Sequence, residues 1–299
     1  MGETDDFKVP PNKKIELKNY DPCWIPKWAQ KEENKKGKKA VKEKALLILQ
    51  ENRKKLVDMQ ELFWASDTYS MLIILQGMDA AGKDSLIRHV MSGVNPQGCQ
   101  VTSFKTPSAE ELDHDFLWRH SKALPERGRI GIFNRSYYED VLVVRVHPEI
   151  LAKQKLPPEA IKKDFWSLRY EDINSFEQHL VRSGTVVLKF FLNVSKEEQK
   201  KRLLERLEDA DKHWKFSLTD LSERSKWKEY MEVYEDMLNA TSTEWAPWYV
   251  IPADKKWVTH ASISGIMVAQ MKKLGLEYPK LSKDQQEALE KAETELKEE

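Results

Sequence analysis

A glycine-rich heptapeptide is the part of the sequence whose residue types point most directly to chemistry. It runs Gly77-Met-Asp-Ala-Ala-Gly82-Lys83 and has the spacing G-x-x-x-x-G-K. In such a loop the glycines let backbone N–H groups turn toward an anion, and the lysine adds a mobile positive charge. An apolar run (71–75) precedes the loop and a helix-like segment (83–91) follows it, as the motif requires. The alternative is a plain glycine turn, but this context favours phosphate binding.

The loop departs from the usual pattern at two positions, and both concern a divalent metal. Asp84 and Ser85 follow Lys83 where a Ser or Thr commonly holds Mg²⁺, and Asp79 lies inside the loop. A carboxylate beside a phosphate chain is repulsive unless a cation bridges the two, so we expect Asp79 to organise Mg²⁺, with Mn²⁺ as a substitute. Alternatively, Asp79 only accepts hydrogen bonds from a helix N-terminus. The expected phosphate-binding residues of the loop are Gly77, Ala80, Ala81, Gly82, Lys83, Asp84 and Ser85.

A second polar segment, Asn134-Arg-Ser-Tyr-Tyr-Glu139-Asp, follows the apolar run 129–133. Phosphate-loop (P-loop) enzymes commonly carry an acidic metal-orienting residue at the end of such a strand, whereas this chain has Asn134 and then Arg135. We expect Glu139 to supply the missing carboxylate as a second metal ligand. Lys83 and Arg135 would offer positive charge to a transferred phosphoryl group, which needs charge stabilisation more than it needs a base. The expected catalytic residues are Asp79, Lys83, Asn134, Arg135 and Glu139.

Short apolar strands alternate with longer helical segments along the chain. Strands are expected at 71–75, 100–104, 129–133, 185–192 and 248–251, and helices at 38–65, 83–91, 108–123, 158–182, 196–208, 219–239 and 257–274. Strands of this length joined by helices favour parallel pairing with right-handed crossovers. We therefore expect a three-layer α/β/α fold of the P-loop type around a five-stranded parallel sheet. Such folds bind ligands at the carboxyl ends of their strands, where both polar segments lie.

Composition and charge exclude several classes of protein to which the chain could otherwise belong. Of 299 residues, 40% are hydrophobic and 10% aromatic, which excludes a wholly disordered chain. Lys and Arg (49) balance Asp and Glu (49), which argues against a generic nucleic-acid binder. The N-terminus lacks an apolar signal region, no apolar run could span a bilayer, and Cys23 and Cys99 form neither a disulfide nor a metal pattern. We expect a soluble cytoplasmic protein with no nucleic-acid or membrane partner.

Three regions are expected along the chain. Residues 1–37 have no sustained periodicity and are predicted to form an extended N-terminal arm, whose apolar Trp24 packs back on the body or on a neighbouring subunit. Residues 38–275 form the P-loop domain. Residues 276–299 form an acidic, helix-prone tail.

Taken together, the polar segments closely resemble the polyphosphate kinase 2 family. The motifs GMDAAGKD, FNRSYYED, SFKTP (103–107) and HDFLWR (114–119) carry the resemblance, which continues through Ser183-Gly184, Lys189-Phe190, Arg202, 206–209, Trp214-Lys215, Ser225 and 246–249. It covers roughly residues 40–275. That family transfers phosphoryl groups between inorganic polyphosphate and nucleotides on a fold like that of thymidylate kinase. Asn134 with Glu139 is similar to the class III subgroup, which phosphorylates both AMP and ADP.

The resemblance implies a Mg²⁺-dependent enzyme that makes ADP and ATP from AMP, ADP and polyphosphate, and a homo-oligomer, either a dimer or a tetramer. It also implies a lid over about 196–228 that closes over the phosphates and excludes water. Composition alone favours a solvated helix with i,i+4 ion pairs in that segment. The implied nucleotide-binding residues are Phe104, Lys105, Asp115 and Arg119, and the implied polyphosphate-binding residues of the lid are Arg202, Arg206 and Arg224.

Two other functions stay open on the residues alone. One is an ATP-dependent nucleoside monophosphate kinase of the thymidylate-kinase type. The other is a non-catalytic nucleotide-sensing module, which the missing Ser or Thr after Lys83 and the amide at Asn134 would allow.

Overall fold

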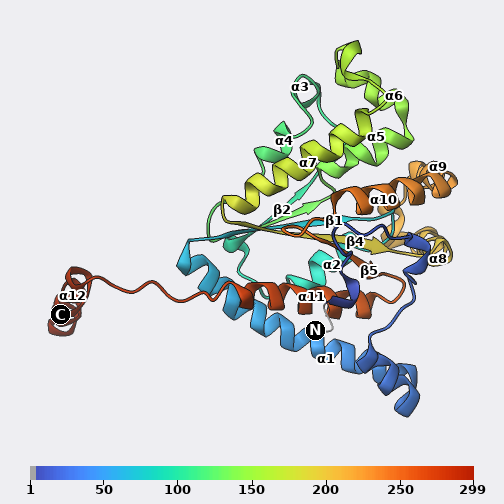
Figure 1. Cartoon of the computed structure of the whole chain (residues 1–299). Coiled ribbons are helices and arrows are strands. Elements are labelled where there is room, and N and C mark those ends of the chain that lie inside the picture. Colours follow the sequence, from blue (N-terminus) through green and yellow to red (C-terminus); the bar gives the residue numbers. More distant parts are fainter. Residues whose placement is uncertain (1–4) are drawn as a thin grey trace.

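A parallel sheet between two layers of helices forms the body of the molecule (Figure 1), as seen in a computed structural model that describes residues 5–299. The strands are β1 (Ser70–Gln76), β2 (Cys99–Ser103), β3 (Ile130–Asn134), β4 (Thr185–Asn193) and β5 (Trp248–Pro252). They are all parallel and lie in the order β2-β3-β1-β4-β5. The predicted five-stranded α/β/α fold is confirmed. Because β1 lies between β3 and β4, the loops that leave β1 and β3 emerge side by side.

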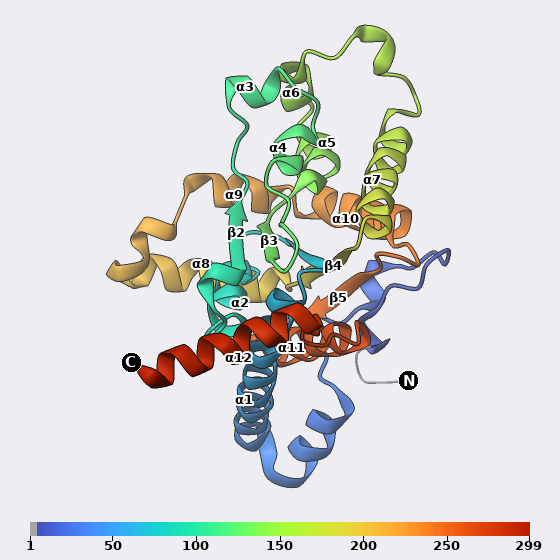
Figure 2. The same ribbon diagram turned by 90° about the vertical axis from the view of Figure 1, so that its left-hand side faces the viewer.

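The helices cover both faces of this sheet. They are α1 (Lys27–Ser66), α2 (Lys83–Val90), α3 (Ala109–Leu112), α4 (Trp118–Ser121), α5 (Val143–Val146), α6 (Pro148–Leu151), α7 (Phe165–Arg182), α8 (Lys196–Glu208), α9 (Leu218–Ser225), α10 (Trp227–Thr241), α11 (Lys256–Lys273) and α12 (Lys283–Glu298). Helices α1, α2 and α11 lie below the sheet in Figure 1, and α7 and α10 lie above it. Helices α8 and α9 stay close together in the turned view as well (Figure 2).

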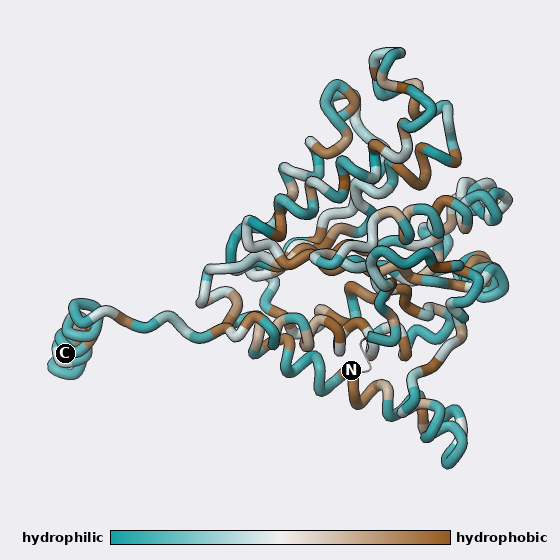
Figure 3. Tube along the Cα trace, in the orientation of Figure 1, coloured by the Kyte–Doolittle hydropathy of each residue, from teal (hydrophilic) through white to brown (hydrophobic). Residues whose placement is uncertain are grey.

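Hydrophobic residues, brown along the Cα trace, concentrate in the strands of the sheet (Figure 3). Every residue of β1 is buried, as are nearly all of those in β4, which explains why the sequence shows these strands as continuous apolar runs. An apolar stripe of α1 is also buried, from Val41 through Leu49 to Phe63. The sheet and this stripe together form the rigid body that carries the loops at the strand ends.

The N-terminal arm differs from the extended segment expected over 1–37. Helix α1 already begins at Lys27, and Gly37, at φ 80°, is a break inside that helix rather than the end of the arm. Glycine tolerates this conformation, so the kink falls where its backbone is least restricted. Earlier in the arm, the Val9 N–H donates to the Trp248 carbonyl at 2.8 Å. The arm therefore packs against β5, as an arm that returns to the body would.

Two segments predicted as single helices are broken. The segment 108–123 contains only the short helices α3 and α4, because the Asp115 carboxylate accepts from the Leu117 N–H at 2.9 Å and turns the chain between them. Helices α9 and α10 divide the segment predicted over 219–239, with Lys226 between them. Both breaks are local side-chain or turn effects that hydrophobic periodicity does not report.

The C-terminal tail forms a helix that stands away from the body (Figure 1). Helix α12 begins with a capping box at Ser282, and all of its residues are exposed, including Leu289 and Leu296 at 56% and 72%. No helix among residues 5–299 combines the length and the apolar character needed to cross a membrane.

Candidate active site

The loop between β1 and α2 has the backbone of an anion-binding turn. A Cβ atom on Gly77 would lie 2.9 Å from the Leu192 carbonyl oxygen, so only glycine allows the loop to approach β4 this closely. Ala80 and Gly82 have φ values of 61° and 113°, and Gly82 is the residue immediately before α2. A loop with left-handed residues followed by a helix N-terminus directs N–H groups toward a bound anion.

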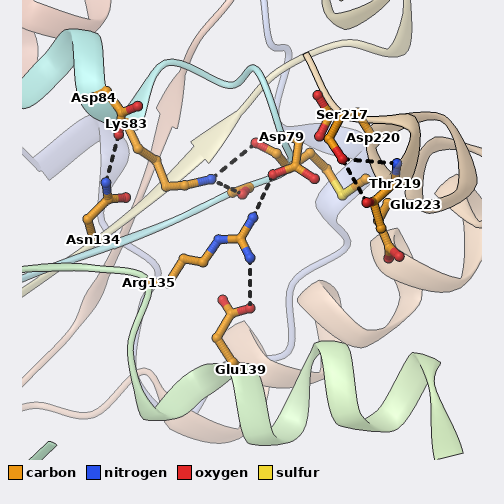
Figure 4. Close-up of polar contacts among 12 residues, drawn as sticks. Asp79, Lys83, Asp84, Asn134, Arg135, Glu139, Ser217, Thr219, Asp220 and Glu223 are labelled. Atoms are coloured by element: carbon orange, nitrogen blue, oxygen red, sulfur yellow. Dashed lines mark hydrogen bonds and ion pairs between the residues drawn. The ribbon is translucent and has the colours of Figure 1, made fainter. Parts of the chain in front are cut away.

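Lys83 extends over this loop (Figure 4). Its Nζ donates to the carbonyl oxygens of Gly77 at 2.6 Å and of Met78 at 3.3 Å. Burial and the nearby Arg135 guanidinium lower the pKa of Lys83, while the carboxylates of the site act in the opposite direction. A partly desolvated ammonium gains more from a phosphate oxygen than one in bulk water does.

Arg135 joins the loop after β3 to the loop after β1. Its Nη2 lies 2.7 Å from Asp79 Oδ1, and its Nη1 lies 3.9 Å from Glu139 Oε2 (Figure 4). The Glu139 and Asp79 carboxylates raise the pKa of Arg135, so it is a permanent cation. Its backbone is left-handed at φ 64°, which costs a non-glycine residue about 1 kcal/mol. The Arg135 N–H donates to the Leu75 carbonyl at 3.1 Å and helps to hold that conformation.

Asn134 points to the other side of this cluster. Its Nδ2 donates to Asp84 Oδ1 at 2.7 Å and approaches Ser103 Oγ at 3.5 Å. The amide thus pairs with the carboxylate that stands where the motif usually has a hydroxyl. The structure brings Asp79, Lys83, Arg135 and Glu139 into one cluster, with the Asn134–Asp84 pair beside it.

Arg202 differs from the phosphate-binding role expected for it. Its side chain is buried at 5% exposure, and all of its N–H groups have protein acceptors. No donor remains for a phosphate, so this arginine holds the phosphate loop against the end of β5. Its acceptors, at 2.6 to 3.2 Å, are Glu198 Oε1 and the carbonyl oxygens of Ala80, Ala81, Ala253 and Asp254.

The other two lid arginines pair within the lid. Arg206 Nη1 lies 3.0 Å from Asp220 Oδ2, and Arg224 Nη1 donates to Gln199 Oε1 at 2.8 Å. Gln199 Nε2 donates in turn to the Asp79 carbonyl at 2.9 Å, which ties the lid to the phosphate loop. Arg206 keeps 21% of its side chain exposed beside the site.

The segment 196–228 also places acidic and hydroxyl groups near the phosphate loop, and no motif in the sequence predicted them. Ser217, Thr219, Asp220 and Glu223 lie on the side of Asp79 away from Lys83 (Figure 4). Burial and Asp79 raise the pKa of Asp220, while Arg206 acts in the opposite direction. The signal available in the sequence was the N-cap pattern Ser217-Leu-Thr-Asp220 at the start of α9.

A buried ion pair supports the turn that carries Arg135 and Glu139. Lys189 and Glu177 are fully buried, with Nζ 2.6 Å from Oε2. Tyr137 and Tyr138 donate their hydroxyls to Glu177 Oε1 at 2.9 and 2.7 Å, and Lys189 Nζ also contacts the Tyr138 hydroxyl at 2.9 Å. These tyrosines belong to the 3-10 turn Tyr137–Val141. A lysine inside an otherwise apolar strand was the sequence signal for such a network, because a buried charge needs a partner.

A cavity of about 430 Å³ lies between the α3–α4 segment and α7. Asp115 and Arg119 line it, as expected for residues near an acceptor, whereas Lys105 is exposed outside its lining. Phe104, for which a nucleotide-binding role was expected, does not line this cavity. That ring is buried in the core against Phe133 at 4.8 Å, while Arg119 lies 5.4 Å from its centre.

Three polar residues of this cavity were not found from the sequence: Asp140 and Arg169, which are buried, and the half-buried Gln154. Arg169 Nη2 donates to Gln154 Oε1 at 3.0 Å, and Gln154 Nε2 donates to Asp140 Oδ1 at 2.5 Å. Burial raises the pKa of Asp140 to about 6, although Arg169 and Gln154 act in the opposite direction. They come from separate segments, with no common motif that could have linked them.

The carboxylates of the cluster fit a divalent ion shared with phosphate better than a closed metal cage. Across residues 5–299, no set of three or more His, Cys, Asp or Glu side chains is arranged to hold a metal. Asp79 and Glu139 nevertheless approach the same guanidinium from two loops. Mg²⁺ in phosphoryl-transfer enzymes usually takes one or two carboxylates and completes its shell with water and phosphate oxygens. Asp79 and Glu139 are the two carboxylates of the cluster that would supply such ligands.

Comparisons with known proteins agree with the chemistry of the cluster. An ADP-polyphosphate phosphotransferase of Rhodopseudomonas palustris is 48% identical over 93% of this chain and 92% of its own length. An AMP/ADP-polyphosphate phosphotransferase of Meiothermus ruber is 44% identical over 91% of this chain and 94% of its own. The crystal structure of polyphosphate kinase 2 from Arthrobacter aurescens TC1 superposes with a TM-score of 0.83 at 37% identity, covering 97% of this chain and 96% of that one.

The family model named Polyphosphate kinase 2 matches residues 36–278, a span that contains the phosphate loop, the Arg135 turn and the lid. The family resemblance expected from the sequence is thereby confirmed. Because this model covers most of the chain and the two relatives are 48% and 44% identical over nearly their whole length, the chain belongs to the polyphosphate kinase 2 family and is a phosphotransferase.

Proposed function

We propose that this phosphotransferase uses inorganic polyphosphate to convert AMP to ADP and ADP to ATP. The observation that carries the proposal is the cluster in which Arg135 contacts the Asp79 and Glu139 carboxylates while Lys83, from the adjacent loop, lies over the anion-binding turn. The names of the two relatives support polyphosphate as donor, and one of them supports AMP as well as ADP as acceptor. The ATP-dependent kinase and the sensing module have no comparable support.

The residues of the cluster account for the demands of this reaction. An acceptor phosphate oxygen is already anionic, so it attacks the terminal phosphorus of polyphosphate without a general base. The new P–O bond forms on the nucleotide while the bond to the shortened polyphosphate breaks. N–H groups of the phosphate loop and Lys83 bind the donor, and Arg135 stabilises charge on the transferred group. Asp79 and Glu139 would hold Mg²⁺, which neutralises phosphate charge when bound. Arg206 and Arg224 would follow the polyphosphate chain along the lid.

The direct test is a reaction mixture with polyphosphate, Mg²⁺ and AMP but no ATP, followed by separation of the products. We expect ADP first and ATP later, with Lys83→Ala as the inactive control. Products from ADP but none from AMP would restrict the acceptor to the diphosphate. Turnover only after ATP is added would favour the thymidylate-kinase alternative, and binding without turnover would favour a sensor.

The metal assignment is tested separately by titrating Mg²⁺ and Mn²⁺ against activity. Asp79→Asn keeps the size of the side chain but removes its charge, so we expect half-maximal activity to need a higher metal concentration. Asp84→Asn is the matched control at the neighbouring carboxylate, which already pairs with Asn134. An unchanged titration in Asp79→Asn would remove this residue from the metal site.

We also propose that the enzyme is a homo-oligomer in which α12 docks on a second copy. Helix α12 presents exposed Leu289 and Leu296 among six acidic residues, while α1 exposes Leu46 and Leu47 beside the lysine-rich segment 35–44. The two surfaces are complementary in charge and both apolar at the centre, and an isolated helix of this length is marginal in water.

The unpaired thiols of Cys23 and Cys99 fit a cytoplasmic location.

Light scattering on the full chain and on the Leu289→Asp/Leu296→Asp variant tests the oligomer. We expect the variant to have a lower mass than the wild type, with Glu290→Gln as a control on the same helix. A monomeric wild type, with α12 folded onto its own α1 or free, would contradict the proposal.

A further inference from the structure

We propose that Arg169, Gln154 and Asp140 read the base of the acceptor nucleotide in the cavity beside α7. The inference rests on the proposed function, because it takes the acceptor to be a nucleotide. It adds three residues from separate segments that determine which base is accepted.

The cavity has the size and walls of a small-molecule site. Its volume of about 430 Å³ is within the range of pockets that enclose ligands of this class. Apolar side chains form much of the wall and would contact the faces of a flat aromatic base. These residues are Leu112, Phe116, Leu156, Phe165 and Leu168.

Arg169 carries a donor that the protein itself leaves unused. The side chain is 7% exposed and is held between the rings of Phe116, at 4.1 Å, and Phe165, at 5.0 Å. Its Nη2 donates to Gln154, but its buried Nη1 has no hydrogen-bond partner among the described residues. A buried N–H without an acceptor costs stability, and a small rotation of this side chain at the cavity wall would let Nη1 reach a ligand acceptor and remove that cost.

Asp140 supplies a hydrogen-bond acceptor beside Arg169 and Gln154, and we call these three residues the polar set. Gln154 occupies its Oδ1, which leaves Oδ2 outside that hydrogen bond. Gln154 uses both ends of its amide and thereby fixes Arg169 and Asp140 relative to each other. One donor and one acceptor held together match a base edge that offers a ring-nitrogen acceptor beside an amino donor, as adenine does at N7 and N6.

The chain connects this set directly to the phosphate cluster. Glu139 and Asp140 are consecutive in the 3-10 turn, and Glu139 faces Arg135 while Asp140 lines the cavity. Arg119 lies at the same cavity. A nucleotide with its base at Arg169 would therefore have its phosphates directed toward Arg135.

The test compares kcat/KM for ADP, GDP, CDP and UDP at saturating polyphosphate and Mg²⁺. In the wild type we expect ADP to be preferred over CDP and UDP. Arg169→Met and Gln154→Leu remove the polar set while keeping much of its volume. Each should lower kcat/KM for ADP by about tenfold or more, and each should bring the ratio of ADP to CDP toward one. Lys162→Met, at an exposed position lining the same cavity, is the control and should keep the wild-type ratio.

The possible results distinguish a failure of base recognition from a failure of nucleotide phosphorylation. Equal losses for all four nucleotides, with the ratios unchanged, would show a structural role and overturn the reading of the base. If the wild type phosphorylates no nucleotide, the proposed function fails. Calorimetry with ADP then tests whether the cavity binds a nucleotide, independently of catalysis. Wild-type binding that Arg169→Met weakens about tenfold would support the cavity, whereas equal binding, or none, would overturn it.

Discussion

Arg135 contacts the carboxylates of both loops that make the cluster, and its left-handed backbone directs it between them. Lysine offers a single charged nitrogen, whereas the planar guanidinium reaches Asp79 with one nitrogen and Glu139 with the other. This geometry makes Arg135 the residue of the site that a lysine could least replace. It also explains why the strand end carries an amide at Asn134, since that side chain turns away to Asp84.

Replacing Arg135 is expected to affect turnover far more than folding. Arg135→Lys keeps the charge but loses the two-sided contact, so we expect kcat to fall by about 10²-fold, in the range seen when one preorganised donor is removed. Steady-state kinetics with polyphosphate and ADP measure the loss, and thermal unfolding shows whether the fold persists. Turnover close to that of the wild type would rule out a role for Arg135 in the transition state.

Glu139 is expected to affect the two acceptors unequally. Glu139→Asn keeps a polar side chain but removes one of the two carboxylates that we propose hold the metal, and the shorter acceptor depends more on that metal for its position. We expect kcat/KM to fall more for AMP than for ADP. Parallel assays with both acceptors measure the ratio, and equal losses would remove Glu139 from acceptor selection.

At the scale of elements, the 3-10 turn Tyr137–Val141 depends on a charge pair in the core. Lys189 and Glu177 have no solvent contact, and their partners include the hydroxyls of both tyrosines in the turn. Burial lowers the pKa of Lys189, and Glu177 opposes that shift. The pair therefore orients the turn but contributes little net stability compared with an apolar core.

Breaking this pair on one side should destabilise the protein strongly. Lys189→Met leaves the Glu177 charge buried without its partner, and we expect the free energy of unfolding to fall by about 3–5 kcal/mol. Urea unfolding measures the change. The double variant Lys189→Met/Glu177→Leu removes both charges and should recover part of the loss, and no recovery would contradict the explanation by an unpaired charge.

The sequence predicted those parts of the molecule whose structure is determined by residues close together in the chain. The apolar runs of β1 and β4 and the glycine loop could be located because burial and backbone freedom depend on residue type. Arg202 could not be understood in this way, since its role depends on carbonyl groups that lie far away in the sequence. The same is true of Phe104, whose neighbours are set by packing, and of the Asp140, Gln154 and Arg169 set.

At the scale of the whole molecule, two buried histidines connect stability to pH. Burial lowers the pKa of His120 to about 3, and burial together with His89 and nearby cations lowers that of His260 to about 4. In the unfolded chain both rings would titrate near the ordinary histidine value of about 6.5. Both histidines therefore stay neutral in the folded protein over a range in which the unfolded chain takes up protons.

Stability is therefore expected to fall as the solution is acidified below about pH 6.5, because protons bind the unfolded state preferentially. Each histidine contributes up to about 1.4 kcal/mol per pH unit between its two pKa values, and the contribution is fully present above pH 6.5. Urea unfolding at pH 7.5, 6.0 and 5.0 measures the slope. His260→Gln should have a shallower slope than the wild type, and an unchanged slope would contradict the assignment.

The contacts of Arg202 also bear on how the site opens. The first two turns of α8 are fastened by this side chain to the phosphate loop and to the end of β5, so they belong to the stationary half of the molecule. Helix α9 is held by other contacts, since Arg224 donates to Gln199 at 2.8 Å and Glu223 pairs with His147 at 2.9 Å. An opening of α9 for substrate entry would have to break these two contacts, whereas the first two turns of α8 would keep their contacts with the phosphate loop.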